Sequence, residues 1–517
     1  MTDFAARYAR AQSDRRHPIS ASFADLQRFD LDPFQVEGCN ALEDGRSVLV
    51  AAPTGAGKTI VGEFAIHLAM REPGDKAFYT TPMKALSNQK FRELQEVYGE
   101  DEVGLLTGDT NINGNARVVV MTTEVLRNML YADSPALRGL RYVVMDEVHY
   151  LADRFRGPVW EEVILHLPPA VRLVSLSATV SNAEEFGDWL DTVRGDTAVI
   201  VSETRPVPLE QHVLVRGDLL PLFDDRAGVA TAQVNQELTR IRSPKGATYE
   251  NNRRASEYRS RSDREGRRPH RGGSRPVRPS TAARIERMDR PQVVELLGRS
   301  NLLPAIFFIF SRVGCEAAVQ QVRRSGVRLT DTAERDEIRA IIDERLRPLQ
   351  DEDLSVLGYW EWRENLERGV ASHHAGMLPA FKEVVEELFR RKLVKVVFAT
   401  ETLALGINMP ARTVVLEKLE KFNGEARVAI TSGEYTQLTG RAGRRGIDVE
   451  GHAVVQWTEA LDPQAVAALA SRRTYPLNSS FRPTYNMAVN LIDQFGRERA
   501  REILESSFAQ FQADRAV

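Results

Sequence analysis

The sequence predicts an α/β protein with two tandem α/β units, each built on a parallel β-sheet. A glycine-rich loop joins an apolar run to a helical pattern of apolar residues at 48–69. Further apolar runs follow, and each ends in polar residues, as parallel strands do at the sheet edge where ligands bind. A second series of such runs begins after residue 291, and 517 residues suffice for about three domains of ~150 residues.

Composition and charge narrow the class of protein. Hydrophobic residues make up 42% and charged residues 27% of the chain, with a net charge of −3, which is typical of globular proteins. The two cysteines, Cys39 and Cys315, form neither a metal-binding nor a disulfide spacing, which favours a reducing, cytoplasmic location. We expect no signal peptide and no membrane span, because no apolar run approaches ~18 residues.

We expect five segments along the chain. They are a leader at 1–25, a first α/β domain at 26–205, a linker with a basic insertion at 206–290, a second α/β domain at 291–465, and a terminal region at 466–517. Between residues 240 and 290 there are 16 Arg or Lys against 6 Asp or Glu. This stretch predicts a disordered insertion, either an arm that binds phosphate groups without sequence preference or a solvated loop with no partner.

The strongest indication of chemistry lies between the apolar run 48–51 and the helix that follows it. The Gly-Lys-Thr sequence at the helix start directs backbone amides and the helix dipole toward phosphate groups. Lys58 adds a charge for the phosphates, and the Thr59 hydroxyl is a suitable Mg²⁺ ligand. We expect nucleotide contacts from Ala52, Pro53, Thr54, Gly55, Ala56, Gly57, Lys58 and Thr59. Ala52 stands where the usual pattern begins with glycine, and the alternative interpretation is a chance glycine turn.

An acidic pair, Asp146 and Glu147, follows the apolar run 143–145. An aspartate that leaves a buried strand opposite a phosphate loop can hold Mg²⁺ through water, and a neighbouring glutamate can deprotonate an attacking water. An isolated acidic pair at a strand end is usually a solvated turn. Its position a few strands after a phosphate loop favours the catalytic interpretation.

Other strand ends add polar residues to the same expected edge of the first sheet. They are residues 81–86, 122–124 and 177–179. Upstream of the phosphate loop, Phe29 and Gln35 are suited to stack on a purine and to hydrogen-bond it. The alternative is an ordinary helix entry with a phenylalanine in the core.

The second unit repeats the pattern without a phosphate loop of its own. The apolar run 304–310 precedes Ser311 and Arg312, and the run 394–398 leads into the polar residues 399–402. The segment 437–446 contains arginines three residues apart, which at a helix start would lie on one side. Two guanidinium groups that face another domain's nucleotide would act as arginine fingers. The alternative is an RNA-contacting or merely solvated basic turn.

In their order, these motifs resemble those of the superfamily 2 DExH-box helicases, and specifically the Ski-like family of RNA helicases that includes the exosome-associated ones. Residues 52–59 are similar to motif I, 146–149 to the DExH box, 177–179 to motif III and 437–444 to motif VI. The subfamily resemblance rests on residues 84–90, 121–130, 160–162 and 480–487. The use of Arg in preference to Lys is typical of a high-GC bacterium.

The resemblance implies two RecA-like domains that share ATP and Mg²⁺ in a cleft, followed by the start of a winged-helix region. It implies catalytic roles for Lys58, Asp146, Glu147, His149, Gln437, Arg441 and Arg444. It adds Phe29, Gln35 and Gly406 to the nucleotide contacts and gives Mg²⁺ to Thr59 and Asp146. The implied nucleic-acid contacts are Pro82, Lys84, Gly108, Thr123, Arg312 and Thr400.

The implied function is ATP-dependent movement along single-stranded or partly duplex RNA by a monomer, with RNA-degradation machinery as a partner. Two alternatives remain at this point. One is a DNA helicase of the same superfamily, and the other is a non-catalytic nucleic-acid-binding scaffold.

Overall fold

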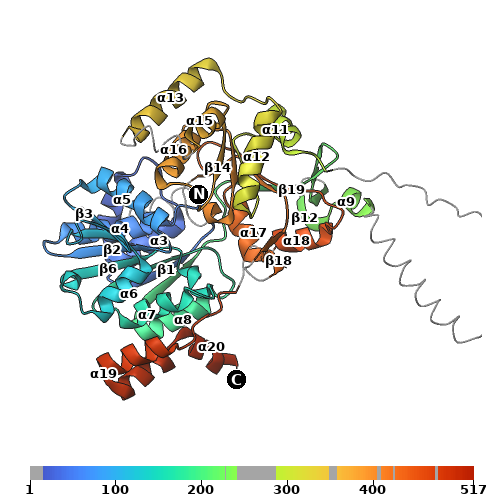
Figure 1. Cartoon of the computed structure of the whole chain (residues 1–517). Helices are drawn as coiled ribbons and strands as arrows, with labels where there is room; N and C mark the ends of the chain where they lie inside the picture. The colour runs from blue at the N-terminus through green and yellow to red at the C-terminus, as the bar shows by residue number, and fades with distance from the viewer. Residues whose placement is uncertain are drawn as a thin grey trace, which may run out of the picture. The chain divides into compact units, whose positions relative to one another are not determined.

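Figure 1 shows the computed structural model of the chain. The structure describes residues 15–226, 229–241, 287–347, 358–404, 409–422, 426–471 and 476–516. The chain divides into two compact units, Met1–Pro206 with Thr474–Val517, and Val207–Arg473. Most of the basic insertion at 240–290 and Gly406 lie outside the described residues, so the hypotheses about them stay predictions.

The described residues of the first unit contain an eight-stranded sheet with the order β4-β3-β5-β2-β6-β7-β1-β8. Its strands are β1 Ser47–Ala51, β2 Lys76–Thr81, β3 Val103–Thr107, β4 Thr110–Ile112, β5 Val118–Thr122, β6 Leu140–Met145, β7 Arg172–Ser177 and β8 Thr197–Val201. Neighbouring strands are parallel, except that β4 runs antiparallel to β3. The α/β fold class with a parallel sheet is therefore confirmed for this unit.

Helices cover both faces of this sheet. They are α2 Pro18–Asp25, α3 Pro33–Glu43, α4 Thr59–Arg71, α5 Lys84–Tyr98, α6 Thr123–Tyr131, α7 Gly157–His166 and α8 Ala183–Arg194, with the 3₁₀ turns η1 Pro135–Leu137 and η2 Val148–Ala152. Successive strand residues face opposite sides. Val144 is buried in one cluster with Phe64 of α4, whereas Val143 is buried in another with Trp160 of α7. Burial on both faces explains why the strands read as continuous apolar runs.

The chain returns to the first unit through the helices α19 Tyr485–Glu505 and α20 Phe508–Ala516. Figure 1 shows both helices next to α7 and α8. The Phe508 ring is fully buried and lies 5.1 Å from the Phe186 ring and 5.2 Å from the Trp189 ring, measured between ring centroids. The Trp189 indole also donates a 2.8 Å hydrogen bond to the Ser506 carbonyl. This segment is thus part of the core of the first unit, and its assignment to a winged-helix region stays a prediction.

Glu161 of α7 is fully buried where the returning segment packs. Its carboxylate accepts hydrogen bonds from the Ser479 hydroxyl and, at 2.8 Å, from the Phe508 backbone N–H. Burial raises the pKa of Glu161 to about 7, and these donors offset only part of that rise.

We expect the substitution Glu161→Gln to weaken the dependence of stability on pH. The folded-state pKa of about 7 lies above the ordinary value of 4.5, so the folded protein keeps a proton that the unfolded chain releases. The stabilisation from this proton is complete below pH 4.5 and is lost as the pH rises through 7, a change of about 3 kcal/mol. Between these pH values, Tm should fall more steeply for the unsubstituted protein than for Glu161→Gln. Parallel curves would contradict the assignment.

In the described residues of the second unit, a seven-stranded sheet has the order β10-β9-β19-β16-β13-β15-β14. Its strands are β9 Leu209–Val215, β10 Asp218–Pro221, β13 Ala305–Phe308, β14 Val370–His373, β15 Val396–Ala399, β16 Thr413–Leu416 and β19 Gly451–Gln456. Neighbours are parallel except β9 and β10. Two short hairpins accompany the sheet, β11 Phe223–Arg226 with β12 Val229–Val234 and β17 Glu420–Phe422 with β18 Arg427–Ala429.

The helices of the second unit surround this sheet. They are α9 Gln236–Arg240, α11 Arg290–Arg299, α12 Arg312–Arg324, α13 Thr332–Leu346, α15 Tyr359–Glu367, α16 Pro379–Arg390, α17 Ser432–Thr439 and α18 Pro463–Ser471, with the 3₁₀ turn η3 Glu401–Ala404. Strand β9 lies in the segment that we predicted as a linker, yet it pairs with β19 over six residues. The second sheet therefore begins before the insertion, at residue 209, rather than after it.

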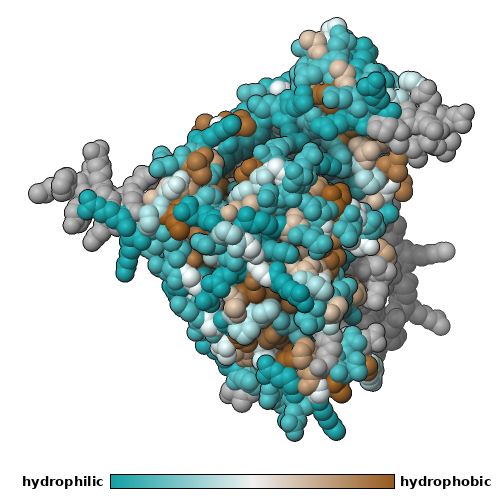
Figure 2. All heavy atoms as spheres, turned by 90° about the vertical axis from the view of Figure 1, so that its left-hand side faces the viewer, coloured by the Kyte–Doolittle hydropathy of each residue, from teal (hydrophilic) through white to brown (hydrophobic). Residues whose placement is uncertain are grey.

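Polar and apolar side chains are mixed on the face of the molecule that Figure 2 shows. The face in Figure 2 is largely hydrophilic, and its hydrophobic side chains occur in small scattered groups. None of the helices in the described part of the chain combines the length and apolar character that crossing a membrane requires.

Candidate nucleotide site and nucleic-acid interface

The loop between β1 and α4 has the backbone conformation of a phosphate loop. Gly55 and Gly57 have φ angles of +81° and +86°, in the left-handed region that favours glycine. Helix α4 begins at Thr59 immediately after Lys58, so its free N-terminal amides lie at the end of the loop. These features supply the amide donors and the positive helix end that the sequence predicts.

Lys58 and the acidic pair meet at the carboxyl ends of β1 and β6. The buried Lys58 ammonium lies 3.4 Å from the Glu147 carboxylate. Glu147 has a left-handed φ of +52°, an uncommon conformation for a residue with a side chain, and its N–H donates a 2.9 Å bond to Asp146. The structure therefore brings together the charge, the metal ligand and the base that were predicted from separate stretches of sequence.

Two further contacts fix the acidic pair and the histidine that follows it. The Tyr79 hydroxyl donates a 2.9 Å hydrogen bond to Asp146, and burial raises the pKa of Asp146 to about 6. His149 accepts a 3.2 Å hydrogen bond at Nδ1 from the backbone N–H of Ala178. Burial lowers the pKa of His149 to about 4, so the ring is neutral at pH 7 and links the end of β6 to the residues after β7.

Gln35 contacts the phosphate loop directly. Its side chain is fully buried, accepts a 2.8 Å bond from the Asp32 N–H and donates a 2.8 Å bond to the Gly57 carbonyl. The amide retains one donor and one acceptor position beyond these bonds. Gln35 therefore braces the loop in addition to the purine contact expected of it.

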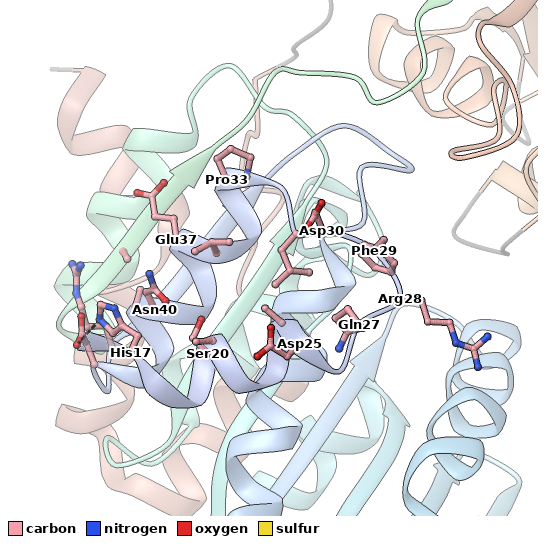
Figure 3. A pocket seen from close by; sticks show the side chains of 18 residues that line it. His17, Ser20, Asp25, Gln27, Arg28, Phe29, Asp30, Pro33, Glu37 and Asn40 are labelled. Atoms are coloured by element: carbon pink, nitrogen blue, oxygen red, sulfur yellow. Dashed lines mark hydrogen bonds and ion pairs between the residues drawn. The ribbon is translucent and has the colours of Figure 1, made fainter. Parts of the chain in front are cut away.

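Phe29 lies about half exposed at the rim of a pocket of about 960 Å³. Figure 3 shows Phe29 and Asp30 at one end of this pocket and His17 at the other, with α2 and α3 forming its walls. The pocket includes none of the phosphate-loop residues. The stacking role of Phe29 thus stays a prediction.

The residues predicted to contact nucleic acid in the first unit gather at one edge of its sheet. Pro82, Gly108 and Thr123 follow the ends of β2, β3 and β5, which are neighbouring strands. Lys84 begins α5, and its ammonium lies 2.6 Å from the Asp109 carboxylate. Lys84 and Gly108 are exposed at this edge, whereas Pro82 and Thr123 are buried, so the exposed part offers a cation and a glycine to a phosphate backbone.

The arginines of the second unit differ from the expectation in one respect. Arg441 and Arg444 come after α17, which ends at Thr439, rather than at a helix start, and Gly443, with φ +86°, turns the chain between them. Arg441 is buried and donates a 2.6 Å bond to the Ala404 carbonyl. Gln437 lies within α17 itself.

Arg444 is held by a carboxylate that sequence analysis did not single out. Its Nε and Nη2 atoms each lie 2.7 Å from an Asp448 oxygen, and its backbone N–H donates a 2.9 Å bond to the same residue. Nη1 takes part in neither side-chain bond. Arg444 and Asp448 are four residues apart in the sequence, but no local sequence pattern predicted that their side chains would pair.

The remaining predicted residues of the second unit lie at the carboxyl ends of its strands. Arg312 begins α12, and Thr400 follows β15 with its hydroxyl 3.0 Å from that of Thr402. Tyr79, Asp448 and Arg156, whose guanidinium bonds the Pro82 carbonyl, contact predicted residues and were missed by sequence analysis. Tyr79 reads from the sequence as an ordinary core residue of an apolar strand.

Comparisons with known proteins identify the family of the chain. Residues 32–186 match the DEAD/DEAH box helicase family, and residues 349–446 match the helicase C-terminal domain family. The "Probable helicase HelY" of Mycobacterium tuberculosis is 63% identical over 493 residues, which cover 95% of this chain and 52% of that protein. The "Exosome RNA helicase MTR4" of Homo sapiens is 39% identical, over 95% of this chain and 44% of that protein.

The similarity extends to a plant protein. The "DExH-box ATP-dependent RNA helicase DExH15 chloroplastic" of Arabidopsis thaliana is 40% identical, over 93% of this chain and 43% of that protein. The chain spans about half the length of the curated relatives it matches. Two helicase domains in the expected order, a formed phosphate loop and this set of relatives confirm the predicted resemblance, and the chain belongs to the DEAD/DEAH-box helicases, in their Ski-like DExH branch.

Proposed function

We propose that this chain hydrolyses ATP with Mg²⁺ and uses the reaction to move along RNA and unwind it. The observation that carries the proposal is the buried Lys58–Glu147 pair, with 3.4 Å between its charged atoms, beside the glycine loop. A lysine, loop amides and a carboxylate base are the groups that phosphoryl transfer to water requires. The relatives MTR4 and DExH15 carry the description RNA helicase, which supports RNA over DNA.

The residues at the loop suit a nucleotide with its metal ion. Thr59 and Asp146 offer the hard oxygen atoms that Mg²⁺ prefers, and the Tyr79 hydroxyl orients one Asp146 oxygen. A bound Mg²⁺ would neutralise part of the phosphate charge. Lys58 would neutralise another part, and the amides at the start of α4 would bind phosphate oxygens.

In this proposal Glu147 is the general base that removes a proton from the attacking water. His149, through its bond to Ala178, links the base to the residues after β7. Gln437, Arg441 and Arg444 belong to the second unit, and Arg444 acts as the arginine finger. Catalysis then requires a conformational step that brings the groups of both units to one nucleotide.

The proposed nucleic-acid contacts are largely to phosphates and are therefore independent of sequence and sensitive to salt. They involve Pro82, Lys84, Gly108, Thr123, Arg312 and Thr400. An association with RNA-degradation machinery, a monomeric state and a cytoplasmic location belong to the same proposal. The partner and the monomeric state are proposed from the family, and the location from the small number of cysteines, rather than from contacts in the structure.

Phosphate release in the presence of single-stranded RNA, single-stranded DNA of equal length, or neither tests this function. We expect RNA to raise the rate at least ~10-fold over the rate without nucleic acid, and DNA to raise it less, because contacts to 2′-hydroxyl groups distinguish the two. Equal or greater stimulation by DNA would favour the DNA helicase. Absence of stimulation by both would favour the non-catalytic scaffold.

A further inference from the structure

The turn that follows the DExH box is supported by a residue from the far end of the chain. The Ser480 hydroxyl oxygen lies 2.8 Å from the Leu151 carbonyl and 2.7 Å from the Asp153 carbonyl. Leu151 belongs to η2, which begins directly after Glu147. A hydroxyl has one proton, so Ser480 donates to these two carbonyls in alternation or as a shared bond.

The contact is close enough to exclude any side chain at Gly157. A Cβ atom added there would lie 2.0 Å from the Ser480 hydroxyl oxygen and 2.1 Å from the Leu151 carbonyl oxygen. Backbone from η2, the first residue of α7 and the returning segment therefore meet at one point. This close approach of backbone atoms requires glycine at position 157. Because the three segments are packed against one another, a displacement of one of them moves the other two.

The returning segment is anchored on both sides of Ser480. Leu477 and Asn182 exchange two hydrogen bonds, of 2.6 Å from the Leu477 N–H and 2.9 Å to its carbonyl. The Ser479 hydroxyl donates to the buried Glu161 carboxylate. Phe481 packs into a buried cluster with α19 residues such as Leu491. These anchors fix the position of Ser480 independently of the turn.

The turn itself connects the two groups of predicted site residues at the carboxyl-terminal edge of the first sheet. At one end, His149 accepts a hydrogen bond from Ala178, and Glu147 pairs with Lys58. At the other end, the Arg156 guanidinium donates a 3.2 Å bond to the Pro82 carbonyl, within the predicted nucleic-acid contact. Ser480 supports this turn between those two ends.

We infer that Ser480 is a positioning residue for Glu147, and that the segment 477–481 acts as a latch that holds the turn of residues 148–157 in the conformation needed for hydrolysis. The inference rests on the proposed function and extends it to residues beyond the helicase motifs. In the sequence, the segment begins four residues after Arg473, the last residue of the second unit.

The test compares Ser480→Ala with Ser506→Ala in the full chain. Ser506 is the matched control, because within the described residues its hydroxyl donates a 2.9 Å hydrogen bond to the Ile503 carbonyl of its own segment. For Ser480→Ala we expect RNA-stimulated kcat to fall ~10-fold with KM for ATP changed less than about twofold, since misplacement of a base by about 1 Å affects the chemical step and not ground-state binding. Ser506→Ala should behave as the unsubstituted protein.

Hydrogen exchange supplies a readout that does not depend on activity. Amides of residues 148–157 should exchange about 10-fold faster in Ser480→Ala and at an unchanged rate in Ser506→Ala. If neither variant changes, or both change alike, the latch is wrong. If the unsubstituted chain releases no phosphate with RNA or DNA, the proposed function fails while the exchange comparison still decides the latch. If Ser480→Ala does not fold, Gly157→Ala tests the latch instead, because its added methyl group would displace the Ser480 hydroxyl and the Leu151 carbonyl.

Discussion

The substitution Glu147→Gln should lower RNA-stimulated phosphate release by about 10³-fold and leave RNA binding intact. Glutamine keeps the size of the side chain but cannot accept a proton from water, so a role as general base is lost while the fold is kept. The carboxylate lies 3.4 Å from the Lys58 ammonium and is held by an uncommon backbone conformation. That arrangement is what a base beside a phosphate site requires.

Steady-state phosphate release and fluorescence anisotropy with labelled single-stranded RNA would measure the two properties in one preparation. Glu72→Gln, at an exposed position just after α4, is a control for the loss of a carboxylate far from the chemistry. Unchanged hydrolysis by purified Glu147→Gln would show that another group removes the proton. Loss of RNA binding together with hydrolysis would indicate that the substitution disturbs the fold.

The second large effect is expected from Arg444→Ala, which should lower kcat about 10³-fold with little change in KM for ATP. An arginine finger stabilises charge that develops on the transferred phosphoryl group, so its loss affects the transition state more than the bound substrate. Asp448→Asn should lower kcat by a smaller factor, about 10-fold. It keeps the shape of the partner but weakens the two 2.7 Å bonds that orient the guanidinium.

Two controls make the arginine result interpretable. Arg299→Ala removes an exposed arginine paired with Glu295 in α11, and Glu387→Gln disrupts a buried carboxylate that binds two arginines of the same unit. Both should hydrolyse ATP normally. If Arg444→Ala has a normal kcat but binds RNA more weakly, the segment is a basic turn that contacts RNA. If both kcat and RNA binding are normal, the segment is a solvated turn without either role.

Local sequence patterns predict the first sheet well, for a physical reason. Its central strands, such as β1 and β5, are buried on both faces, so each appears as an apolar run that ends where the chain leaves the core, whereas the short edge strand β4 is exposed and has no such pattern. The loop at residues 52–59 is equally local, because its glycines and the lysine act within one turn of backbone. The acidic pair could be placed opposite that loop because parallel strands present their carboxyl ends at one edge.

The features that were missed depend on contacts between distant parts of the chain. Strand β9 joins the parallel part of the second sheet by pairing with β19, more than 200 residues later, and its own sequence does not identify that partner. The return of Phe508 to the core of the first unit is a long-range contact of the same kind. Asp448 is close to Arg444 in sequence, but the two are brought together by a turn over residues 444–448 that contains Gly446, with φ +74°, rather than by a regular helix.

The measurement that bears most directly on the whole account is phosphate release by the unsubstituted chain with and without saturating single-stranded RNA, beside a Lys58→Ala preparation that defines the background. We expect release that rises at least ~10-fold with RNA and is absent without the Lys58 ammonium. Release that RNA does not raise above the Lys58→Ala background would contradict it.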